Sequence, residues 1–122
     1  MLAEALTFVI ASLLHFDINL PLGIATIHGE SFLGAAIPEA IIAGVLLAGT
    51  IGVFASPRGT WGLALATTLF ATAGVIIGLS VIVGGRVSRP GDLAYHSIIL
   101  IALLVTIVLL LTRGARRAMR PR

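Results

Sequence analysis

Apolar residues fill four long stretches of the chain, and polar residues gather between them. The stretches cover residues 2–20, about 32–55, 60–84 and 93–112. Each is close to the ~20 residues that a helix needs to cross a hydrocarbon layer of ~30 Å. No strand-like alternation interrupts them, and only helices or closed barrels satisfy all their backbone groups in lipid. The pattern predicts an all-α integral membrane protein, one domain over residues 1–122 with four transmembrane helices in an up-down bundle.

The composition agrees with this pattern. Hydrophobic residues make up 58% of the 122 residues and charged residues 11%, and the mean hydropathy is +1.13. The first stretch has neither the basic start nor the small-residue cleavage site of a secretory signal, so we expect it to remain as a permanent helix. The sequence has no cysteine, which excludes disulfides.

The arginines predict the orientation of the bundle. The chain has eight of them and no lysine, and five lie in the tail at 113–122, RGARRAMRPR. Short basic segments stay on the cytoplasmic side of a membrane. We therefore expect both termini to be cytoplasmic, the loops at 15–30 and 85–92 to face outward, and the protein to reside in a bacterial cytoplasmic membrane. The two arginines of the 85–92 loop oppose this orientation. Because the tail is explained as a topology signal, we expect no nucleic-acid partner.

Small residues recur at the spacing that lets helices approach one another closely. They are Gly44, Ala48 and Gly52 in the second stretch, and Gly74 and Gly78 in the third. The pattern predicts close packing within the bundle, self-association or contact with other membrane subunits.

Pro38 leaves two interpretations of the second stretch open. It either kinks a long helix or occupies the first turn of a helix that begins there. In the first case Glu39 is an ionisable residue within the membrane, and in the second it is a first-turn acid stabilised by the helix dipole.

Polar residues share faces on three of the predicted helices, given an advance of 100° per residue. The residues are Glu4, Thr7, Ser12, His15 and Asn19 in the first stretch, Glu39 and Thr50 in the second, and Asp92, His96 and Thr106 in the fourth. A polar face is costly against lipid. We expect all three faces to point into the bundle, toward a partner or into a cavity.

The predicted topology places every histidine and four of the five carboxylates at the outer side. These residues are His15, Asp17, His28, Glu30, Glu39, Asp92 and His96. Imidazole and carboxylate ligands suit a divalent transition metal such as copper, zinc or iron. Two facing histidines, His15 and His96, are sufficient to hold a haem. Glu39 and His96 also fit a quinone pocket or a proton path. The simplest alternative is that all these polar residues only face water at the outer surface or form hydrogen bonds with one another.

Function is predicted only as a class. No phosphate-binding loop, nucleophile elbow or metalloprotease motif is present, so we do not expect the chain to be catalytic on its own. The first hypothesis is a small accessory or structural subunit of a larger membrane complex, with or without an outer His and carboxylate site on this subunit. The alternative is a membrane protein that binds a metal, haem or quinone, and the third is a small homo-oligomeric transporter.

Overall fold

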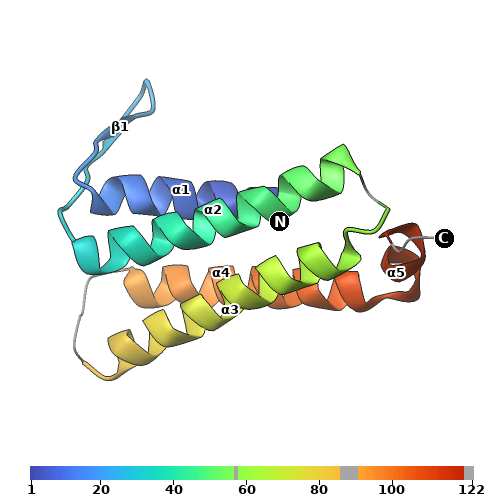
Figure 1. Cartoon of the computed structure of the whole chain (residues 1–122). Coiled ribbons are helices and arrows are strands. Elements are labelled where there is room, and N and C mark those ends of the chain that lie inside the picture. The colour runs from blue at the N-terminus through green and yellow to red at the C-terminus, as the bar shows by residue number, and fades with distance from the viewer. Residues whose placement is uncertain (57, 86–90, 120–122) are drawn as a thin grey trace.

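The computed structural model describes residues 1–56, 58–85 and 91–119, and these residues are mainly helical. The helices are α1 (Leu2–His15), α2 (Leu33–Ala55), α3 (Trp61–Val83), α4 (Asp92–Leu111) and α5 (Arg113–Met119), and a small hairpin pairs β1 (Leu20–Pro21) with β2 (Thr26–Ile27). The first four helices lie side by side, and α5 turns across one end of them (Figure 1). The prediction of an all-α protein is confirmed.

Three helices are long and apolar enough to cross a membrane, namely α2, α3 and α4. Their bounds differ by one residue or less from those of the corresponding apolar stretches in the sequence. Many of their large apolar side chains, such as Ile76, Ile101 and Val108, face outward. The structure is thus that of an integral membrane protein whose helices contact lipid.

The first predicted span is shorter than its apolar stretch. α1 has 14 residues, which extend about 21 Å at 1.5 Å per residue and do not cover a ~30 Å hydrocarbon layer. The helix ends at His15 because Asp17 adopts a left-handed φ of 66°. The amides of Asp17 and Ile18 then donate to the carbonyls of Leu14 and Leu13, as in a Schellman cap. The fourth crossing stays a prediction.

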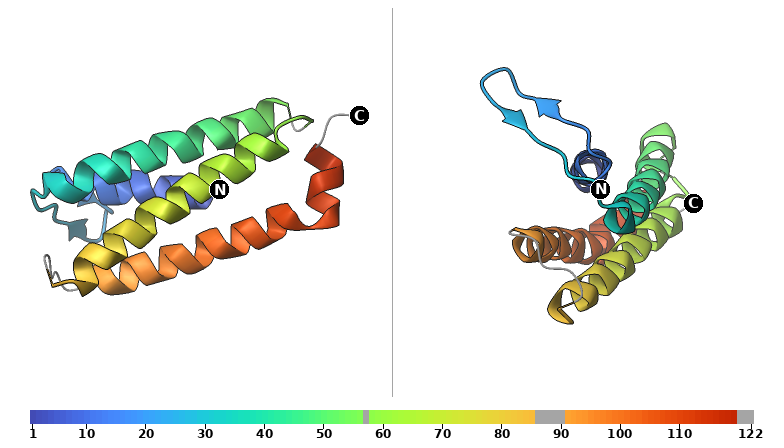
Figure 2. Two further views of the ribbon diagram at one scale, coloured as in Figure 1. Left: turned by 60° about the horizontal axis from the view of Figure 1, so that its bottom comes forward. Right: turned by 90° about the vertical axis from the view of Figure 1, so that its left-hand side faces the viewer.

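The segment after α1 forms a hairpin that projects from the bundle (Figure 2). Leu20 pairs with Ile27, and Pro21 pairs with Thr26. Its base is fixed to the end of α1, because the amide of Glu30 donates to the carbonyl of Leu14 at 2.8 Å. The sequence predicted only a loop here, since two-residue strands are too short to give an alternating pattern.

α2 begins at Leu33 and contains Pro38 in its interior. Of the two interpretations of Pro38, the structure shows the long helix. Pro38 has no amide hydrogen, so the carbonyl of Gly34 does not receive its usual hydrogen bond from residue i+4. Glu39 therefore lies within the helix and is buried, with 4% of its surface exposed.

The bundle packs in chain order. α1 lies mainly against α2, α2 against α3, and α3 against α4. The core combines large and small residues, which are Ala5, Phe8, Ile42, Ala43, Leu46, Ala71, Val75, Ile99 and Leu103. The threonines buried on α3 satisfy their hydroxyls locally. Thr68 and Thr72, for example, donate to backbone carbonyls four residues earlier.

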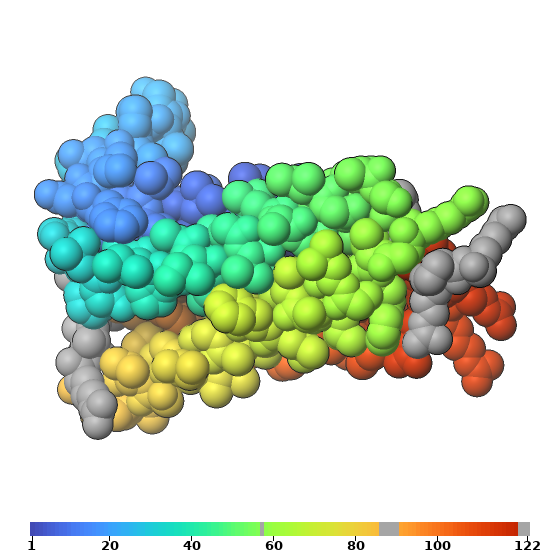
Figure 3. All heavy atoms as spheres, viewed as in Figure 1, coloured from blue at the N-terminus to red at the C-terminus, as the bar shows by residue number. Residues whose placement is uncertain are grey.

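One end of the molecule is basic and closed by α5. The amide of Gly59, in the turn between α2 and α3, donates to the carbonyl of Met119 at 2.7 Å. The indole of Trp61 donates to the carbonyl of Leu110 at 2.7 Å, and Arg116 lies 5.3 Å from the ring centroid of Trp61. The hairpin lies at the opposite end of the bundle (Figure 3).

Candidate functional site

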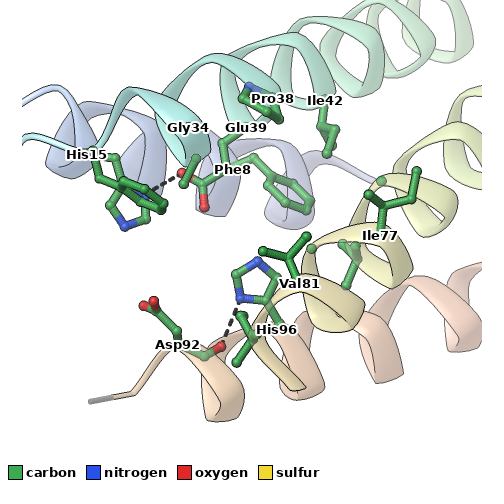
Figure 4. Close-up of a pocket in the computed structure, with 16 residues that line it drawn as sticks. Phe8, His15, Gly34, Pro38, Glu39, Ile42, Ile77, Val81, Asp92 and His96 are labelled. Carbon is green, nitrogen blue, oxygen red and sulfur yellow. Dashed lines mark hydrogen bonds and ion pairs between the residues drawn. The ribbon is translucent and has the colours of Figure 1, made fainter. Parts of the chain in front are cut away.

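A cavity of about 160 Å³ lies at the end of the bundle that carries the hairpin. Helices α1 to α4 all line it, which places residues far apart in the sequence around one space (Figure 4). The lining residues are Phe8, His15, Phe32, Gly34, Ala35, Pro38, Glu39, Ile42, Gly74, Val75, Ile77, Gly78, Val81, Ile82, Asp92 and His96.

The centre of the site is a hydrogen-bonded pair between α1 and α2. Nδ1 of His15 lies 2.7 Å from Oε2 of Glu39, and the side chains are 15% and 5% exposed. One proton lies between these two atoms, as in other imidazole–carboxylate pairs. The second carboxylate oxygen, Oε1, is buried and has no hydrogen-bond partner among the described residues. Since a buried polar atom is costly to leave unpaired, this oxygen marks the cavity as a place for a ligand or ordered water.

His96 approaches the same cavity from α4. Its Nδ1 lies 2.8 Å from the backbone carbonyl of Asp92. A carbonyl only accepts hydrogen bonds, so Nδ1 carries a proton, and in the neutral tautomer of this ring Nε2 is an acceptor. Gly78 makes room for this ring, because a Cβ at that position would lie 3.1 Å from Nε2.

The remaining walls are apolar and partly aromatic. The ring of Phe32 meets that of His15 edge to face, with centroids 6.0 Å apart. Phe8 lies between the core and the cavity and meets Tyr95 edge to face at 6.4 Å. The site therefore consists of a few polar atoms set in a hydrophobic enclosure, which is typical of pockets for small molecules.

The seven predicted site residues divide into two groups. His15, Glu39, Asp92 and His96 line the cavity, whereas Asp17, His28 and Glu30 lie exposed in the connection that includes the hairpin. The structure thus brings two of the three imidazoles to one space and leaves His28 outside it.

Metal and haem binding stay predictions of the sequence. Across the ranges that the structure describes, no group of three or more His, Asp and Glu side chains is arranged to hold a metal ion.

A second polar contact lies deeper in the bundle. The hydroxyl of Thr106 on α4 donates to Oε1 of Glu4 at 2.5 Å, and the amino group of Met1 pairs with the other oxygen of Glu4. On the same face of α1, Ser12 donates to the carbonyl of Ala36 at 2.9 Å. Glu4, Ser12 and His15 therefore all make contacts within the bundle, whereas Asn19 lies beyond the helix end.

Sequence reasoning missed several residues that shape the cavity. Phe8, Phe32 and Gly78 carry no chemistry that marks them as site residues, and their role depends on tertiary packing. The small-residue spacing predicts close helix packing at Gly78, and the group that approaches Gly78 is the imidazole of His96. The spacing of Gly74 and Gly78 indicates that another group comes close to the helix, but it does not indicate which side chain that is.

Comparisons with known proteins do not identify a relative. No family model, no curated protein and no solved structure matches the chain.

Proposed function

We propose that the chain is a small accessory subunit of a larger membrane complex and that its cavity binds a small amphipathic molecule. The observation that carries the proposal is the unpaired Oε1 of Glu39, which is buried in an apolar cavity beside His15 and His96. An ionisable residue within a membrane helix is a functional candidate because it is costly to keep there. Neither pairing with His15 nor exposure to solvent satisfies that oxygen.

The size of the cavity limits the ligand. Its volume of about 160 Å³ is below the ~300–1,000 Å³ of pockets that enclose drug-sized molecules. A single ring or a short chain fits, or the polar head of a longer molecule whose tail extends into lipid.

The proposed setting is the outer half of a bacterial cytoplasmic membrane. The described basic residues of α5 and Arg58 lie at the end away from the cavity, and basic ends stay cytoplasmic. The C-terminus is cytoplasmic in this proposal, and α1, the fourth and shortest membrane segment, has its N-terminus directed toward the same side.

An exposed small-residue surface on α2 supports assembly with other subunits. Gly44 and Ala48 are both exposed, and a Cβ at Gly44 would meet no atom within 4 Å. Such a surface lets another helix approach closely. By contrast, Gly52, Gly74 and Gly78 already face side chains of this chain.

The proposal is tested by purifying the protein from its native membrane in a mild detergent. Mass analysis is expected to find other membrane subunits at fixed ratio and a small molecule retained by the protein. The variant Glu39→Gln should keep the subunits and lose the small molecule, whereas Glu4→Gln, a matched change at the other buried carboxylate, should keep both. A chain that purifies alone would refute the accessory role, and an empty cavity in every preparation would refute the binding role.

A further inference from the structure

We infer that the occupant of this cavity is a small organic ammonium ion that carries an apolar group. The inference rests on the proposed binding function and names the chemical class of the ligand. It follows from an inventory of the hydrogen-bonding atoms around the cavity, which are nearly all acceptors.

Two side-chain atoms supply the main acceptors. Oε1 of Glu39 has no donor among the described residues, and only 4% of the surface of Glu39 is exposed. In the neutral tautomer of His96, Nε2 is an acceptor because Nδ1 donates its proton to the carbonyl of Asp92. Both residues line the same cavity from different helices. A ligand that satisfies them must bring hydrogen atoms of its own.

One further lining residue, Asp92, contributes the acceptors of its carboxylate. The proton between Nδ1 of His15 and Oε2 of Glu39 is used in the hydrogen bond of that pair. A quinone presents only carbonyl acceptors and would face acceptors on both sides, so its oxidised form does not fit this inventory.

The charged groups around the cavity also favour a cationic ligand. Two carboxylates, Glu39 and Asp92, border the cavity, and the imidazoles of His15 and His96 are the described basic groups beside it. The described arginines lie at the other end of the bundle, in the turn after α2 and in α5. A ligand with one positive charge compensates a buried carboxylate, and N–H donors on a charged group make the stronger hydrogen bonds.

The walls select the apolar part of the ligand. Phe8 and Phe32 offer aromatic rings, which attract a cation within about 6 Å of a ring centroid. Ile42, Val75 and Val81 provide aliphatic contact. A hydrated inorganic cation gains little from such walls, whereas an amine on an apolar group uses both features.

Binding of benzylammonium and of its neutral counterpart benzyl alcohol tests the inference. The two probes share size and shape and differ in charge and in the number of donors. Calorimetric titration of the purified protein in detergent at pH 7 should show benzylammonium binding at least about tenfold more tightly. Glu39→Gln should reduce that preference to about threefold or less, and Glu4→Gln should leave it unchanged.

Each outcome decides a different question. Equal binding of the two probes would refute the ammonium inference and leave the binding pocket in place, and so would tighter binding of hydroquinone than of benzylammonium. Failure of all three probes to bind would count against the proposed function itself. If Glu39→Gln does not fold, His96→Gln replaces an acceptor by a group that also donates and should weaken benzylammonium binding by about threefold to tenfold. An unchanged affinity in that variant would also refute the inference.

Discussion

At the residue scale, Glu39 is the central polar residue of the cavity. One oxygen bonds to His15, and the other lies buried without a partner in the described structure. A buried carboxylate is stable only when its oxygens are bonded, and removing one partner costs more than replacing both partners by apolar groups. We therefore expect the cost of breaking the His15 and Glu39 pair to come mainly from the unpaired, buried carboxylate that remains.

This balance predicts a non-additive pair of substitutions. His15→Leu alone should destabilise the protein by about 1–3 kcal/mol, because Glu39 loses its donor while staying buried. The double variant His15→Leu/Glu39→Leu should recover much of that loss, since no unpaired charge remains. Denaturation in detergent with increasing dodecyl sulfate measures both values. A double variant that is less stable than the single variant would show that the unpaired carboxylate of Glu39 is not the cause of the loss.

Four of the residues that line the cavity could be predicted from the sequence alone. His15, Glu39, Asp92 and His96 could be predicted because helical spacing places polar residues on faces that avoid lipid. His28 could not be placed, since its position depends on a hairpin that points away from the bundle.

At the element scale, the length of each apolar stretch predicted the bounds of α2, α3 and α4 within a residue at each end. The thickness of the membrane sets both the length of the apolar stretch and the length of the helix. The same criterion failed for α1. The stretch stays apolar through Ile18 and Leu20, but the backbone leaves the helix at Asp17, which tolerates the left-handed conformation better than most residues. A short cap thus overrode the hydrophobic pattern.

The two kinds of glycine on α2 give a matched test of packing. A Cβ at Gly49 would overlap the side chain of Thr67, whereas a Cβ at Gly44 would meet nothing within 4 Å. Gly49→Ala should therefore cost about 1–3 kcal/mol of unfolding free energy, and Gly44→Ala should be neutral or gain up to about 1 kcal/mol from helix propensity. Thermal melts of the two variants in the same detergent check this. Equal stability of the two would mean that α2 and α3 are not packed as closely as described.

At the scale of the whole molecule, the charged residues that the structure describes differ between the two ends of the bundle. One end carries α5 with Arg113, Arg116 and Arg117, and the other carries the hairpin and the cavity with Glu39 and Asp92. Arg86 and Arg89, which opposed the predicted orientation, lie outside the described residues. The asymmetry links the orientation of the protein to the side from which its cavity is reached.

Cysteine labelling tests that orientation directly, because the natural sequence contains no cysteine. Ile24 at the tip of the hairpin is fully exposed, and a Cβ at Gly114 on α5 would meet no atom within 4 Å, so a single cysteine at either position should leave the fold intact. Basic segments are retained in the cytoplasm. A membrane-impermeant maleimide added to intact cells should therefore label Ile24→Cys and not Gly114→Cys, and permeabilised cells should label both. The reverse pattern would place the His15 and Glu39 pair near the cytoplasm, and a ligand would then reach the cavity from inside the cell.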